Sequence, residues 1–210
     1  PLASYNTFIQ NMQGMVEAAH FLRPLTTTHP SAVSSGTPQS FTHPALPGVT
    51  FTLLYSDPAP TGPSCAYTTN NASIVLKIEI NGVTMLFTGD ANGKNRNTTG
   101  TASPLYVEQS LLALEAQYPG TLNADLLKVP HHGSETANTQ SFIDAINPRF
   151  AIISASTVHH LPRSTVVDRY ENGQRVVLRT DANRERNRDH IYCQSTTVGS
   201  LNCNYSDVLQ

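Results

Sequence analysis

Two apolar runs that each end in metal-ligand residue types constrain this chain more than any other feature. Residues 83–90 read Val-Thr-Met-Leu-Phe-Thr-Gly-Asp, and residues 125–134 read Asp-Leu-Leu-Lys-Val-Pro-His-His-Gly-Ser. Both runs have the composition of strands, and the loops at strand ends are where a rigid scaffold commonly presents ligands and catalysts. The sequence therefore predicts Asp90 at the end of one strand, and His131 and His132 at the end of another.

A carboxylate and an imidazole from neighbouring strand ends suit zinc or another divalent ion, because His offers nitrogen and Asp offers oxygen. Each motif alone also has a plain structural interpretation. Thr-Gly-Asp is a common turn, since Gly and Asp favour turn geometry, and His-His-Gly-Ser also reads as a capped turn. The two motifs in this order, each after its own apolar run, favour a metal site over two unrelated turns.

The two motifs resemble the C-terminal half of the metallo-β-lactamase fold, most closely its ComEC-like branch. In that branch one strand ends in Leu-Thr-Gly-Asp, and a later strand ends in Leu-Lys-Val-x-His-His-Gly-Ser. Three further segments resemble its Asn-x-x-Ser-hydrophobic, Pro-Arg-hydrophobic-Ser and Arg-Thr-Asp strands, in the family's order within residues 48–181: residues 70–76, 147–154 and 177–181. The resemblance implies an α/β fold, namely the C-terminal half of an αββα sandwich, with a mixed sheet and flanking helices.

One departure from the family's pattern concerns the N-terminal half. The family places most of its metal ligands there, in a His-x-His-x-Asp-His motif that this sequence lacks. The early histidines, His20, His29 and His43, do not have that spacing. We therefore expect residues 1–210 to form a single partial domain, whose other half is an upstream segment, a cleaved fragment or another chain.

The resemblance also implies roles for individual residues. In the family, the Thr-Gly-Asp carboxylate bridges two metal ions, and the His-His-Gly-Ser block gives one imidazole to the second ion. Carried over, Asp90 is the bridging ligand and His132, in preference to His131, is the imidazole ligand. His131 would then meet the leaving group or phosphate of the substrate, and His160 is a second candidate for that role. The implied cofactor is a divalent metal ion, with zinc as the first candidate. A completed site would hold two such ions.

The resemblance implies hydrolysis by a metal-activated water molecule, with phosphoester bonds as the first candidate substrate. A bound divalent metal makes this chemistry possible because it lowers the pKa of water to about 7. Two ligands do not hold a catalytic zinc, which normally takes three from the protein. Two functions therefore stay open. Either an upstream segment or a second chain supplies the missing ligands to a hydrolase, or the half-domain is a non-catalytic extracellular structural or binding protein. Formation of an oligomer also stays open.

Composition argues against two kinds of partner. The net charge is −2 and only 13% of the residues are charged. Such a balance creates no broad positive field that would attract nucleic acid. No apolar run approaches the roughly 18 residues that a membrane-spanning helix needs. The sequence thus indicates neither a nucleic-acid partner nor a membrane segment.

Several features favour a secreted, glycosylated protein. Cys193 and Cys203 lie ten residues apart, a separation that a hairpin can bridge, and we predict that they are joined. Cys65 would be free or would pair with the missing segment. Glycosylation sequons occur at Asn71, Asn97 and Asn204. If Asn71 packs near the site, we expect it to carry no glycan.

The positions of helices and strands follow from periodicity and turn signals. We expect helices over residues 4–22, 104–117, 138–146 and 164–170, and strands over residues 49–55, 73–80, 83–88, 125–129, 150–154 and 175–179. Asn81-Gly82 predicts a tight hairpin. Ser103 is expected to cap the helix over 104–117, with Pro104 in its first turn. A long loop is expected over 24–48, and a tail or closing hairpin over 184–210.

Overall fold

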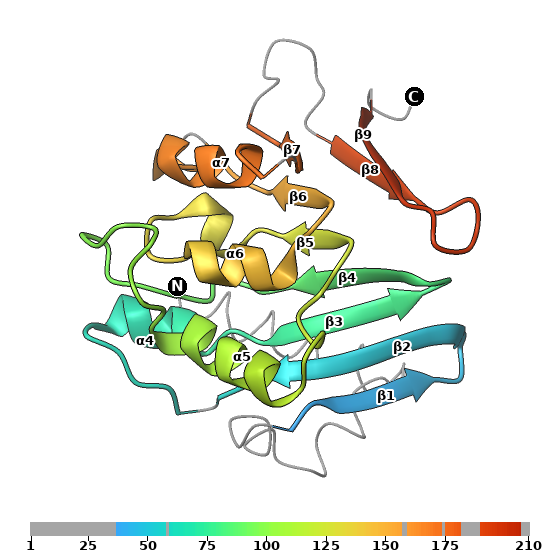
Figure 1. Ribbon diagram of the computed structural model, residues 1–210, viewed down its shortest axis with the longest axis horizontal. Coiled ribbons are helices and arrows are strands. Elements are labelled where there is room, and N and C mark those ends of the chain that lie inside the picture. Colours follow the sequence, from blue (N-terminus) through green and yellow to red (C-terminus); the bar gives the residue numbers. More distant parts are fainter. Residues whose placement is uncertain (1–36, 58, 157–158, 174, 182–189, 207–210) are drawn as a thin grey trace, which may run out of the picture.

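The computed structural model describes residues 37–57, 59–156, 159–173, 175–181 and 190–206 (Figure 1). The helix expected over residues 4–22 lies outside these ranges. No helix of the described residues is long and apolar enough to cross a membrane.

A seven-stranded mixed sheet forms the centre of the α/β fold, with its strands in chain order. The strands are β1 (Gln39–His43), β2 (Leu46–Tyr55), β3 (Val75–Ile80), β4 (Val83–Phe87), β5 (Leu126–Lys128), β6 (Phe150–Ile153) and β7 (Val176–Arg179). Strands β1 to β4 pair antiparallel, and β4 to β7 pair parallel. The tight β3–β4 turn has φ of 51° at Asn81 and 71° at Gly82, the positive values that the sequence predicted for an Asn-Gly hairpin.

Helices cover one face of this sheet. They are α4 (Cys65–Asn71), α5 (Tyr106–Gln117), α6 (Gln140–Ile146) and α7 (Ser164–Glu171) (Figure 1). Buried apolar side chains from α5, α6, α7 and the strands form the main core: Leu54, Val75, Leu86, Leu111, Leu127, Phe142, Ile143, Ile153, Val166 and Tyr170. Because parallel strands place their carboxyl ends at one edge, the loops after β4, β5 and β6 meet there.

A closing hairpin packs against the other face. Strands β8 (His190–Gln194) and β9 (Asn202–Ser206) pair antiparallel. Leu201 and Cys203 form a second apolar cluster with residues of β4 to β7. A disulfide joins Cys193 to Cys203, which face each other in register, as the sequence predicted. Cys65 is free and exposed.

Three sequence predictions need correction. The loop expected over 24–48 holds β1 and the start of β2 in its described part, where Phe41 stacks on Phe51 at 5.3 Å across the strand pair. Helix α5 begins at Tyr106 instead of residue 104, because the preceding Leu105 is extended and its N–H donates to the Gly93 carbonyl at 2.7 Å. Helix α4 was not predicted, since its short polar sequence has no apolar periodicity.

Candidate metal site at the carboxyl edge of the sheet

Asp90 is held at the end of β4 by contacts with two neighbouring segments. The Thr88 hydroxyl donates to the Lys128 carbonyl at 2.8 Å, which ties the end of β4 to the end of β5. Gly89 has a φ of 55°, and a Cβ there would lie 2.9 Å from the Ser73 hydroxyl. That hydroxyl accepts the Asp90 N–H at 2.9 Å. The close passage of Gly89 over Ser73 thus fixes the backbone from which the Asp90 carboxylate projects.

His131 and His132 lie in a tight turn after β5, the 3-10 segment Pro130–Gly133. Their φ values are 48° and 55°, a left-handed conformation that is uncommon outside glycine and costs of order 1–3 kcal/mol per residue. The surrounding hydrogen bonds hold it in place. The His131 N–H donates to the Gly89 carbonyl at 3.1 Å, and the Ser134 N–H donates to the His131 carbonyl at 2.9 Å.

The side chains of Asp90 and His132 meet at the ends of two adjacent parallel strands, as the sequence predicted. His132 Nε2 lies 3.3 Å from Asp90 Oδ1. His132 Nδ1 donates to the Ser154 carbonyl at 2.6 Å, because a carbonyl oxygen can only accept. This hydrogen bond orients the ring and leaves Nε2 directed at the carboxylate, which is the arrangement that metal-binding histidines commonly have.

His131 is held beside this pair by two polar side chains. The Thr136 hydroxyl lies 3.0 Å from its Nδ1, and the Asn70 amide nitrogen lies 3.4 Å from its Nε2. Burial is the main cause that lowers the pKa of His131 below its usual value, and the Asp90 carboxylate opposes this shift. Burial thus favours the neutral imidazole, which can donate one hydrogen bond and accept another.

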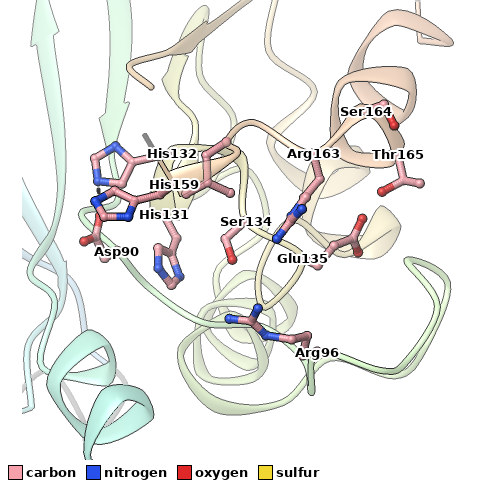
Figure 2. Close-up of a pocket in the computed structure, with 11 residues that line it drawn as sticks. Asp90, Arg96, His131, His132, Ser134, Glu135, His159, Arg163, Ser164 and Thr165 are labelled. Atoms are coloured by element: carbon pink, nitrogen blue, oxygen red, sulfur yellow. Dashed lines mark ion pairs between the residues drawn. The ribbon is translucent and has the colours of Figure 1, made fainter. Parts of the chain in front are cut away.

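A cavity of about 770 Å³ is lined by the predicted site residues Asp90, His131 and His132 (Figure 2). His159 also lines this cavity, whereas the predicted His160 is exposed and does not. His160 has a φ of 52°, a left-handed backbone conformation. A sequence pattern of two adjacent histidines could not settle which one faces the site.

Three cations near the site were not predicted. Arg96 and Arg163 line the cavity, and the Lys128 ammonium donates to the Gly89 carbonyl at 3.2 Å. Burial lowers the pKa of Lys128, and the nearby Asp90 carboxylate opposes that shift. Arg96 belongs to the polar loop that directly follows Asp90, a position that could have signalled it. Nothing in the sequence around Arg163 marks it as a site residue.

Asp90 and His132 fit as two ligands of one divalent ion. Their facing atoms are close enough to share an ion with ligand bonds near 2 Å. Among the described residues, no group of three or more His, Cys, Asp or Glu side chains could hold a metal ion. A complete site would therefore need further ligands from outside the part of the chain that the structure describes.

Asn71 lies at the end of α4, near the site, and is buried. Its side-chain nitrogen donates to the Thr61 carbonyl at 2.8 Å, and its side-chain oxygen accepts from Asn92 at 3.0 Å. N-linked glycan attaches at that nitrogen, so the folded chain has no room for one at this sequon. The sequons at Asn97 and Asn204 are exposed.

Curated proteins similar to this chain include competence proteins. The chain is 32% identical over 116 residues to ComE operon protein 3 of Bacillus subtilis (strain 168), an alignment that covers 54% of this chain and 13% of the relative. It is 30% identical over 114 residues to Competence protein ComA of Neisseria gonorrhoeae, which covers 53% and 14%. The protein YcaI of Escherichia coli (strain K12) is 33% identical over 104 residues, which cover 49% and 12%.

These similarities support a relationship to the ComEC-like competence proteins over about half of the chain. No family model matches the sequence. The aligned part is 12–14% of the length of each of these relatives. The activity of those much longer proteins can therefore only be proposed for this chain.

Proposed function

We propose that this chain supplies one half of a secreted, metal-dependent hydrolase of the metallo-β-lactamase fold, which acts on phosphoester bonds. An upstream segment or a second chain supplies the remaining ligands. The observation that carries this proposal is the 3.3 Å approach of His132 Nε2 to Asp90 Oδ1 from two adjacent strand ends. The α/β sheet with helices on one face and the ComEC-like similarity both support it.

Each residue of the site has a chemical role in this proposal. Asp90 and His132 bind a divalent ion, and the Ser154 carbonyl keeps the proton of His132 on Nδ1. When bound, zinc would activate a water molecule and neutralise negative charge at the reacting phosphorus. His131 lies beside them and is the residue proposed to meet the leaving group or phosphate of the substrate, with its ring held by the Thr136 hydroxyl and the Asn70 amide.

The charges around the cavity support an anionic substrate. Arg96 and Arg163 line it, and the half-buried Lys128 lies beside Asp90. Positive groups in a concave site attract phosphate more strongly than on an open surface, because low-dielectric walls focus the field. The overall charge of −2 is therefore compatible with a local phosphate site.

A non-catalytic binding protein is the second candidate. The described residues supply no third metal ligand near Asp90 and His132, which favours a vestigial site. In that case Asp90 would be an ordinary turn carboxylate, and its substitution would change stability by less than about 0.5 kcal/mol. Metal content separates the two candidates.

We expect the native protein, purified with its partner segment, to contain zinc that is lost in Asp90→Asn. Asn keeps the shape of Asp but lacks the negative charge that a ligand bridging two cations needs. Metal analysis and hydrolysis of bis(p-nitrophenyl) phosphate are the measurements. Asp168→Asn, which removes an exposed carboxylate of α7 outside the cavity, is the matched control and should keep both. Equal zinc content in wild type and Asp90→Asn would instead support the binding protein.

The purified chain of residues 1–210 alone is expected not to hydrolyse phosphodiesters, because two ligands do not hold a catalytic zinc. Turnover of the same diester with added zinc is the measurement. The native mass is a companion observation, since a complete protein should exceed 22.8 kDa. Metal-dependent turnover by the chain alone would contradict this prediction and would place further ligands within it.

A further inference from the structure

Two arginines on the cavity wall are free of ion pairs with the other residues that the structure describes. They are Arg96 and Arg163, both exposed at the cavity. Behind them, the single negative charge of Glu135 is shared by two cations, since its carboxylate lies 3.3 Å from the Lys94 ammonium and 3.7 Å from the Arg169 guanidinium. These five side chains together therefore carry a net positive charge, and Arg96 and Arg163 are the two cations that face the cavity without an acidic partner among the described residues.

The backbones that carry the two arginines are fixed. The Arg163 N–H donates to the Gly133 carbonyl at 3.0 Å, which anchors it to the turn that holds His131 and His132. The Arg96 N–H donates to the Tyr67 hydroxyl at 3.1 Å. Both line the cavity, and Figure 2 shows Arg163 on the far side of Ser134 from Asp90 and the Arg96 guanidinium below Ser134. A group bound by the arginines would thus be separate from one bound at Asp90.

A second, smaller hollow of about 340 Å³ adjoins this end of the cavity. The two share Arg96, Glu135 and Thr165 as lining residues, so Arg96 stands where they meet. Arg169 also lines the hollow, and its Nε atom is buried without a hydrogen-bond partner among the described residues. The positive end of the cavity therefore continues past the site and leaves room for an extended anion.

We propose that Arg96 and Arg163 bind a second, non-reacting phosphate of the substrate, which therefore carries at least two phosphate groups. The assignment of the reacting phosphate to the Asp90–His132 end rests on the proposed function. A guanidinium has a planar fork of donors that matches phosphate oxygens, and such charge-assisted hydrogen bonds are among the strong ones. A phosphomonoester would leave the two arginines unused.

Pyrophosphate binding to the full chain tests this subsite in the presence of a chelator, by titration calorimetry. Arg96→Gln and Arg163→Gln should each weaken binding about tenfold, and the double variant should weaken it further. Inorganic phosphate should bind more weakly than pyrophosphate and should show the same losses. Arg149→Gln is the matched control, because Arg149 is exposed outside the cavity, over the Phe150 ring. An unchanged melting temperature in each variant shows that folding is preserved.

This experiment separates the subsite from the proposed metal chemistry, because the chelator removes any metal ion. Asp90→Asn should bind pyrophosphate at least as tightly as wild type, since it removes a negative charge from the cavity. Arginine-dependent binding under these conditions would support the subsite, whereas native protein purified with its partner segment that contained no zinc would overturn the hydrolase and leave the subsite standing. Equal binding by wild type and the double variant, or no measurable binding by wild type, would overturn the subsite.

Discussion

Replacing Gly93 by Ala is expected to destabilise the protein by about 2–3 kcal/mol, the upper part of the range for overpacking a buried site. Gly93 is buried, and a Cβ there would overlap the carboxyl group of Glu108. The backbone cannot retreat easily. The Gly93 N–H donates to the Thr136 carbonyl at 2.8 Å, and its carbonyl accepts the Leu105 N–H at 2.7 Å.

Movement of the Glu108 side chain would break hydrogen bonds. Its buried carboxyl group accepts the Asn138 N–H at 2.5 Å, the Thr139 N–H at 3.1 Å and the Thr139 hydroxyl at 2.6 Å. These groups precede α6, and the Asn138 amide in turn donates to the Pro130 and Ser134 carbonyls, each at 3.3 Å. Displacement of Glu108 would therefore also loosen the turn that carries the two site histidines.

Urea unfolding of four proteins measures this effect: wild type, Gly93→Ala, Glu108→Ala and the double variant. In the Glu108→Ala background the overlap is gone, so Gly93→Ala should add little, and the two substitutions should be strongly non-additive. Gly120→Ala is a useful comparison, because Gly120 has a φ of 87° but open space around it, and backbone strain alone costs roughly 1–2 kcal/mol. An equal cost of Gly93→Ala in both backgrounds would contradict the explanation.

The contribution of Glu108 to the free energy of unfolding is expected to fall by about 3 kcal/mol as the pH rises from 4.5 to 7. Burial raises the pKa of Glu108 to about 7 from its ordinary 4.5, although the hydrogen bonds from Thr139 and Asn138 and the charge of Arg169 oppose this. Between these values the unfolded chain has lost the proton and the folded chain keeps it. The contribution is therefore complete below pH 4.5 and is lost as the pH passes through 7.

Comparison with Glu108→Gln isolates this contribution, because Gln has a similar shape and does not titrate. The difference in free energy of unfolding between wild type and variant should shift by about 3 kcal/mol in favour of the variant between pH 4.5 and pH 8. All other titrating groups are common to both proteins and cancel. Parallel stability profiles across this range would show that Glu108 is ionised in the folded protein.

Local chemistry made much of the fold predictable. Asn81 and Gly82 tolerate positive φ, so the β3–β4 hairpin follows from two residues. The apolar runs before Asp90 and His131 form strands β4 and β5, because strand composition and length are properties of a short segment. The Cys193–Cys203 disulfide likewise follows from a short separation.

Long-range packing decided the rest. Strand β1 pairs with β2, where Phe41 stacks on Phe51, and no periodicity in its own five residues signals that pairing. That His159 and not His160 lines the cavity depends on how the loop after β6 folds. In both cases a pattern of residue types does not predict the contact or loop conformation that decides the outcome.

The sequence by itself determined the α/β class, the order of the main strands and the presence of ligand residues at two strand ends. Only the tertiary structure decided that Asp90 Oδ1 and His132 Nε2 lie 3.3 Å apart, and that Arg96 and Arg163 line the same cavity. The physical reason is the range of the interactions. Backbone propensity acts within a few residues, whereas a site joins side chains from segments that only the packed sheet brings together.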